Sequence, residues 1–130
     1  ARGQLWISQV AIGNENALNL RVYGTKGALE WQQENPNILW FTRKGDPRQR
    51  ITRASDGLSA EATGATRIPV GHPEGYLEGF ATLYSDIADC LTDDAENHEL
   101  PNIHDGLEGM FFIEACIASA SENGAWRSLL

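Results

Sequence analysis

The sequence is poor in cysteine and has no long apolar run, and each shortage excludes a class of protein. Its 130 residues include two cysteines, Cys90 and Cys116, too few for the disulfide framework of a small secreted domain. Both lie in helix-like apolar patterns, so we expect reduced thiols in the core of a cytoplasmic protein. No stretch approaches the roughly 18 apolar residues of a transmembrane helix, and no signal peptide is present. A membrane is therefore not an expected partner.

Basic residues are also scarce. Ten lysines and arginines stand against 18 acidic residues, which gives a formal net charge of −8. Nucleic acids select a basic face, so we expect no nucleic-acid partner. The basic residues between Arg43 and Arg53 follow a turn and a polar strand pattern, which we interpret as a solvated sheet edge. With 42% hydrophobic and 22% charged residues, the composition is that of a folded chain, expected to form one domain over 1–130.

The motifs of common catalytic and cofactor sites are missing as well. No G-x-G-x-x-G fingerprint follows a strand, and there is no G-x-S-x-G nucleophile elbow. Residues 24–27 (GTKG) have the wrong spacing for a phosphate loop and indicate a hairpin turn. The spacing of His98, His104 and Asp105 matches no zinc or iron signature. We assign no catalytic, cofactor or metal residue, and the lack of an acid–base set disfavours a self-contained small enzyme.

The first half of the chain contains short strand-like segments separated by turn residues. Apolar residues alternate or cluster over 3–12, 17–23, 28–32, 38–43 and 48–53. Their spacing is that of hairpins, so we expect a chiefly antiparallel sheet. Residues 54–67 are small and polar, and we assign them no regular structure.

The second half predicts two helices. Over 71–91 apolar residues recur at spacings of three and four, with Pro73 expected at the first helical position. Asp105 and Glu108 have the form of a capping box and predict a second helix over 105–122. The acidic residues 92–99 are expected to form a surface connection, and Trp126 to begin a final short strand.

These elements indicate an α+β fold. We expect an open, mainly antiparallel sheet with two main helices packed on one face. The other face would carry Trp6, Ile38 and Trp40, although an exposed sheet face normally carries polar residues. We interpret these side chains as a self-association surface; the alternative is scattered surface aromatics.

His72 is the one candidate for ligand contact. It precedes Pro73 at the expected start of the long helix, where free N–H groups create a polar, anion-tolerant position. An imidazole there can hydrogen-bond a hydroxyl-rich ligand. The alternative is that His72 caps the helix or binds a nearby carbonyl.

Three stretches stand out together: 71–80 (GHPEGYLEGF), continued by Leu83-Tyr84-Ser85-Asp86-Ile87; the hairpin 22–31 (VYGTKGALEW); and 105–107 (DGL) with 113–115 (IEA) and 119–126 (SASENGAW). Together they resemble the C-terminal domain of the Gfo/Idh/MocA family, NAD(P)-dependent oxidoreductases that act mostly on sugars, cyclitols and related polyols.

The resemblance implies that a Rossmann domain, carrying NAD or NADP and the catalytic residues, precedes Ala1. The absence of an initiator methionine also leads us to expect a part of a longer protein. On this interpretation the chain supplies a substrate-pocket wall with His72, and a sheet face for a dimer or tetramer, and is inactive alone. The alternative is a non-catalytic binding or assembly module that uses the same sheet face.

Overall fold

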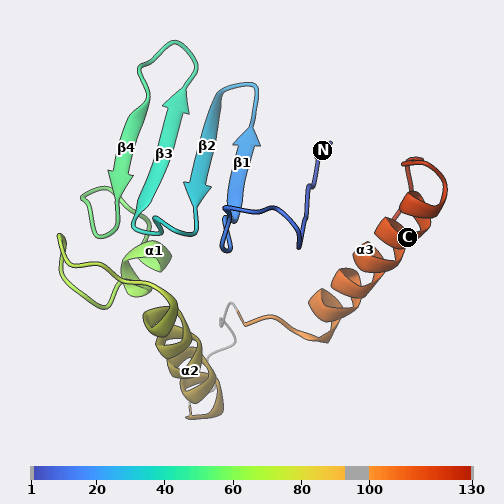
Figure 1. Ribbon diagram of the computed structural model, residues 1–130. Helices are drawn as coiled ribbons and strands as arrows, with labels where there is room; N and C mark the ends of the chain where they lie inside the picture. Colours follow the sequence, from blue (N-terminus) through green and yellow to red (C-terminus); the bar gives the residue numbers. More distant parts are fainter. Residues whose placement is uncertain (1, 93–99, 130) are drawn as a thin grey trace. The chain divides into compact units, whose positions relative to one another are not determined.

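The computed structural model describes residues 2–92 and 100–129. It contains two compact parts, Ala1–Phe80 and Ala81–Leu130. The strands come first in the chain and the helices follow (Figure 1). The combination of an antiparallel sheet with helices confirms the predicted α+β class.

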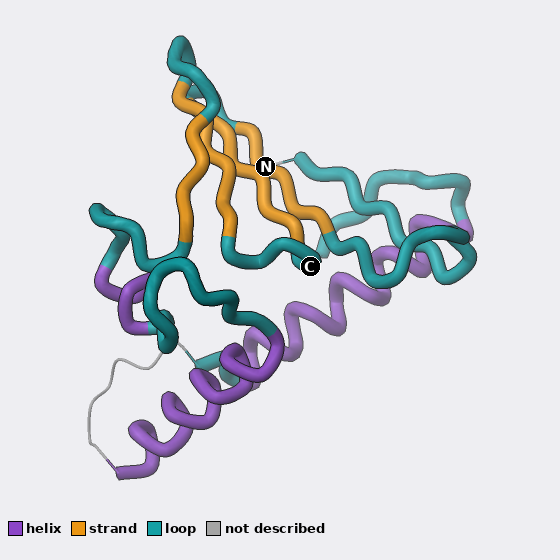
Figure 2. The backbone as a smooth tube through the Cα atoms, turned by 60° about the vertical axis from the view of Figure 1, so that its left-hand side comes forward, coloured by secondary structure: helices purple, strands orange, loops and turns teal. Residues whose placement is uncertain are grey.

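Four strands form one sheet in the order of the sequence. They are β1 (Asn19–Tyr23), β2 (Gly27–Gln32), β3 (Ile38–Arg43) and β4 (Gln49–Thr52). Each strand pairs antiparallel with the next, and the strands lie side by side in both backbone views (Figures 1 and 2). The predicted hairpin turn at 24–27 is confirmed, because the Gly24 N–H donates to the Gly27 carbonyl at 2.8 Å.

The register separates the strand residues into two unlike faces. Paired residues share a face, and Leu20 lies opposite Trp31, which lies opposite Leu39. We call this side the apolar face; its apolar members are Leu20, Val22, Leu29, Trp31, Leu39, Phe41 and Ile51, and Gly27, Arg43 and Gln49 lie toward one end of it. The opposite side, here the mixed face, carries Arg21, Tyr23, Glu30, Ile38, Trp40, Arg50 and Thr52.

The expected strand over 3–12 does not form. None of these residues belongs to a strand, and most of the segment is exposed, with Trp6 at 78%. Apolar alternation makes a strand only where a neighbour supplies backbone hydrogen bonds. Within the described ranges this segment makes only local backbone bonds, such as that of the Ile12 N–H to the Val10 carbonyl. Trp6 is therefore not on the sheet.

A short helix, α1 (Ala60–Gly64), lies within the segment to which the sequence assigned no structure. Ser59 caps it, since the Ser59 hydroxyl accepts the Ala62 N–H at 3.2 Å. Its residues are small and polar on every side, so no apolar stripe marks the helix in the sequence.

Helix α2 (Tyr76–Thr92) starts later than expected. Pro73 precedes the helix instead of occupying its first position, because Asn37 and Arg53 bind residues of the segment 67–74 to the end of the sheet. The first turn is instead closed by Glu78, whose carboxylate accepts the Gly75 N–H at 2.9 Å. Of the predicted connection 92–99, Thr92 ends α2 and the remainder lies outside the described residues.

Helix α3 (Ile103–Ser121) has a capping box, one turn earlier than predicted. Asn102 is the N-cap and accepts the His104 N–H, while Asp105 reaches back to the Asn102 N–H, each at 2.7 Å. Asp105 thus has the role assigned to Glu108. Gly124, with φ +80°, follows the helix as expected, but Trp126 lies in no strand.

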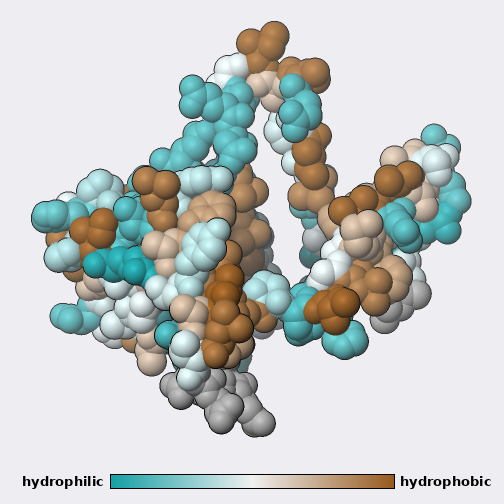
Figure 3. All heavy atoms as spheres, turned by 90° about the horizontal axis from the view of Figure 1, so that it is seen from below, coloured by the Kyte–Doolittle hydropathy of each residue, from teal (hydrophilic) through white to brown (hydrophobic). Residues whose placement is uncertain are grey.

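None of the described residues is buried over its whole surface, and the core expected around the two cysteines is not found among them. Cys90 and Cys116 are free, as expected, but exposed. The α2 residues Phe80 and Leu83 are 45% and 39% exposed, and Figure 3 shows hydrophobic atoms (brown) at the surface. A pattern of apolar residues marks the face to be covered, but does not show what covers it.

No helix in the described ranges is long and apolar enough to cross a membrane.

Gly27 is needed where β2 meets β3. A Cβ atom there would lie 2.7 Å from the Thr42 carbonyl oxygen, a backbone atom that cannot rotate away. We expect Gly27→Ala to lower the free energy of unfolding by about 1–3 kcal/mol, the usual effect of overpacking. Gly79→Ala is the control, because nothing lies within 4 Å of its Cβ position in α2. We expect it to stabilise by about 0.5–1 kcal/mol. Equal melting temperatures for the two variants would contradict this.

Glu78 makes the start of α2 sensitive to acid. The Gly75 N–H, its own backbone N–H and, more weakly, the Arg53 cation hold the pKa of Glu78 below its ordinary value of 4.5. A lowered pKa in the folded state means that Glu78 stabilises the helix start above pH 4.5, and that this effect is lost as the pH falls through the folded pKa. We expect the Gly75 amide signal in NMR spectra to titrate below pH 4.5. Glu78→Gln should abolish this titration, and Glu108→Gln on α3 should not.

Candidate functional site

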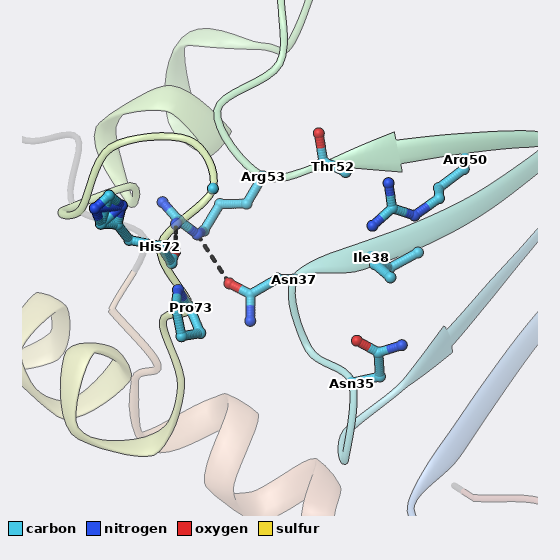
Figure 4. A pocket seen from close by; sticks show the side chains of 9 residues that line it. Asn35, Asn37, Ile38, Arg50, Thr52, Arg53, His72 and Pro73 are labelled. Atoms are coloured by element: carbon cyan, nitrogen blue, oxygen red, sulfur yellow. Dashed lines mark hydrogen bonds between the residues drawn. The ribbon is translucent and has the colours of Figure 1, made fainter.

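A hollow of about 250 Å³ lies at the end of the sheet where β3 begins and β4 ends (Figure 4). It is smaller than the roughly 300–1,000 Å³ of complete ligand pockets, so it has the size of part of a site. Its lining comes from three segments: Asn35, Asn37 and Ile38; Arg50, Thr52 and Arg53; and Gly71, His72 and Pro73.

Asn37, Arg53 and Glu74 form a hydrogen-bonded network beside this hollow. The Arg53 Nε lies 3.0 Å from the Asn37 Oδ1 and 3.2 Å from the Glu74 Oε2. The Asn37 side chain also binds the backbone of Glu74 twice. Its Nδ2 donates to the Glu74 carbonyl at 2.8 Å, and its Oδ1 accepts the Glu74 N–H at 3.0 Å. Two residues at strand ends thereby hold Glu74, two positions before α2 begins.

The same network fixes the loop 67–74. Arg53 donates through Nη1 to the carbonyl of Ile68 and through Nη2 to the carbonyl of His72, with the Pro69 carbonyl at 3.4 Å. The Glu74 Oε1 accepts the backbone N–H groups of Arg67 and Ile68. The loop has no strand to pair with, so these side chains satisfy backbone groups that would otherwise need water.

His72 is held by its backbone while its imidazole is left exposed. In Figure 4 the ring points away from Ile38 and Arg50. The ring makes no hydrogen bond to any residue that the structure describes. Because α2 begins at Tyr76, His72 does not cap it, and the alternative that it satisfies a carbonyl with its ring is not supported. The ring is thus available to a molecule outside this chain.

The opposite wall of the hollow belongs to the mixed face. Arg50 and Thr52 on β4 pair with Trp40 and Ile38 on β3. The Arg50 guanidinium and the Thr52 hydroxyl on this wall, and the Asn35 amide in the turn before β3, can donate hydrogen bonds. The hollow contains no nucleophile placed against a base, so the arrangement suits binding and orientation rather than bond making.

The predicted interface residues are only partly brought together. Ile38 and Trp40 share the mixed face, whereas Trp6 lies in the exposed segment before β1. The Arg48 guanidinium covers Trp40, 4.3 Å from the ring centroid, and lies 3.2 Å from Glu30. The mixed face is therefore more polar than the sequence alternation predicts.

Sequence reasoning missed the network. It grouped Arg53 with a solvated basic edge and assigned no site role to Asn37 or Glu74. The Arg53 side chain is instead only 16% exposed. Asn37 lies 37 positions before Glu74 and 16 before Arg53, so no local spacing connects them. The only signal is the polar character of three residues beside strand and helix ends.

No group of histidine, cysteine or acidic residues within 2–92 and 100–129 has the arrangement of a metal site. His104 is exposed at the start of α3, where its N–H binds Asn102. His98 lies outside the described residues.

Comparison with known proteins gives consistent matches over nearly the whole chain. A curated relative, the uncharacterized oxidoreductase YfiI of Bacillus subtilis (strain 168), is 30% identical over 97% of this chain and 34% of its own length. The crystal structure of an oxidoreductase from Sinorhizobium meliloti is 51% identical, with a TM-score of 0.86, over 93% of this chain and 35% of that one. An inositol dehydrogenase homologue from Azotobacter vinelandii, complexed with NADH and myo-inositol, is 34% identical with a TM-score of 0.84, over 93% of this chain and 34% of that one.

The chain thus spans about a third of the length of these relatives. The family model of the oxidoreductase family C-terminal alpha/beta domain matches residues 1–129. With the sheet, the helices and the 71–80 motif in place, this match shows that the chain belongs to the Gfo/Idh/MocA oxidoreductase family, as its C-terminal alpha/beta domain.

Proposed function

We propose that the chain forms one wall of the substrate pocket in an NAD(P)-dependent dehydrogenase that acts on a cyclitol, sugar or related polyol. The observation that carries this proposal is the loop 67–74, whose backbone is fixed at both ends while the His72 imidazole is left exposed. The inositol dehydrogenase homologue complexed with NADH and myo-inositol supports the substrate class.

A polyol substrate suits the exposed imidazole of His72. An imidazole has one ring nitrogen that donates and one that accepts when neutral, so it can bind a hydroxyl group in either sense. Each such hydrogen bond contributes about 0.5–1.5 kcal/mol net. His72 would therefore select and orient a hydroxylated substrate without taking part in bond making.

The cofactor does not fit this chain. The sequence has no dinucleotide-binding fingerprint, and the lining of the hollow contains no helix N-terminus with glycine-rich backbone to hold a pyrophosphate. In the parent protein we place NAD or NADP on a Rossmann domain outside these 130 residues. We also propose that the chain is inactive alone and that the parent is cytoplasmic, where its two free cysteines stay reduced.

The mixed face is proposed as the surface of a homo-oligomer. Ile38 and Trp40 supply apolar area, and Arg48, Glu30 and Arg50 supply a charged surround, the composition of an interface with an aromatic anchor. Trp6 is 78% exposed and remains a candidate for the same contact. The alternative of a non-catalytic assembly module would use this same face.

His72→Ala in the full-length protein tests the substrate assignment. With NAD and myo-inositol as the assayed pair, we expect the KM for myo-inositol to rise about tenfold, as for the loss of one good hydrogen bond, with kcat nearly unchanged. His104→Ala is the matched control, because His104 is an exposed histidine on α3. An unchanged KM in His72→Ala, for myo-inositol and for a panel of other polyols, would refute the assignment.

Trp40→Asp tests the interface. A carboxylate in place of a central aromatic should break a sheet-mediated contact, and the native mass in light scattering should fall to that of a smaller oligomer. Trp126→Asp is the control, since Trp126 is 81% exposed and lies outside the sheet. If both variants keep the native mass, the mixed face is not the interface.

A further inference from the structure

The ion pair of Arg53 and Glu74 differs from the other ion pairs in the described ranges. Its side chains are 16% and 8% exposed, against 48% and 27% for Arg48 and Glu30 and 37% and 53% for Arg127 and Glu122. An exposed pair contributes little because water competes for both charges. A pair this sheltered persists only if further hydrogen bonds compensate both groups for lost water.

Those hydrogen bonds all lead to the loop that carries His72. All three nitrogens of the Arg53 guanidinium have acceptors: Asn37 Oδ1 and Glu74 Oε2 for Nε, the Ile68 carbonyl for Nη1, and the Pro69 and His72 carbonyls for Nη2. Each of the three guanidinium nitrogens therefore has an acceptor inside the chain, and its contacts are directed at the loop.

Glu74 completes the arrangement from the other side of the loop. One carboxylate oxygen accepts the N–H groups of Arg67 and Ile68, and the other accepts from Arg53. The backbone of Glu74 is bound to Asn37. The loop between these points is thus fixed before any ligand arrives, and ordering it on binding costs no affinity.

We propose that Arg53 and Glu74 are positioning residues, which set substrate affinity through His72 without touching the substrate. This rests on the proposed function, because it presupposes that His72 meets the substrate. The planar fork of arginine suits the role, since three nitrogens aim at acceptors in different directions. Lysine has the same charge but a single nitrogen, so it cannot bind the Ile68 and His72 carbonyls and the Glu74 carboxylate together.

The test is Arg53→Lys in the full-length protein, assayed with NAD and myo-inositol. We expect the KM for myo-inositol to rise about tenfold while the KM for NAD stays unchanged. Arg43→Lys is the matched control, an exposed arginine at the end of β3 for which we expect no change.

A double-mutant cycle then separates positioning from a general loss of structure. If Arg53 acts through His72, Arg53→Lys should add nothing to the KM of His72→Ala. Full additivity, or an unchanged KM in Arg53→Lys alone, would overturn the proposal. If His72→Ala itself has no effect, the proposed substrate contact fails instead, which is a distinguishable result.

A second measurement does not depend on turnover or on the lysine variant. Glu74→Ala removes the carboxylate that holds the Arg67 and Ile68 amides. Hydrogen exchange at these amides should become about tenfold faster, as for one lost hydrogen bond, with exchange in α3 unchanged. The imidazole signals of His72 in NMR spectra should shift or split in the same variant. Unchanged exchange and unchanged His72 signals would refute the positioning role even if the protein does not oxidise myo-inositol.

Discussion

The sheltered ion pair of Arg53 and Glu74 is the contact on which the candidate site depends. It joins the end of β4 to Glu74, two positions before α2, and Asn37, next to the start of β3, completes the contact. Because the loop 67–74 has no regular secondary structure, its shape is set by these three side chains. The same contacts determine where α2 begins, since residues bound to the sheet end cannot also form its first turn.

The two faces of the sheet differ in polarity, and this difference determines what each face can contact. The apolar face joins Leu20 through Trp31 to Leu39 in register, whereas the mixed face surrounds Trp40 with charged groups. A face of the second kind can meet water or another protein surface. A face of the first kind needs a cover, and exposed apolar residues remain throughout the described chain.

The family match and the site geometry both bear on which functions this chain can supply. The chain spans about a third of its relatives, and its hollow is lined by groups that bind and orient. Nothing in its sequence has the fingerprint of a dinucleotide site. These features support the proposal that this domain shapes one wall of a substrate pocket whose reactive groups lie outside these 130 residues.

Local patterns in the sequence determined much of the fold. Alternation over 17–53 predicted four hairpin-connected strands, apolar periodicity predicted α2, and a capping-box pattern predicted α3, because these signals depend on neighbours within a few residues. The same reasoning failed for 3–12, where a strand needs a pairing partner, and for the capping box, which Asn102 forms one turn before the expected site.

The sequence by itself determined the fold class, the antiparallel order and the motif around His72. Only the tertiary structure decided that Asn37, Arg53 and Glu74 meet, that the loop is fixed while the His72 ring is exposed, and that Trp6 leaves the sheet. The reason is physical: secondary structure arises from short-range periodicity, whereas hydrogen bonds between residues 16 and 37 positions apart form only when the folded backbone brings their side chains together.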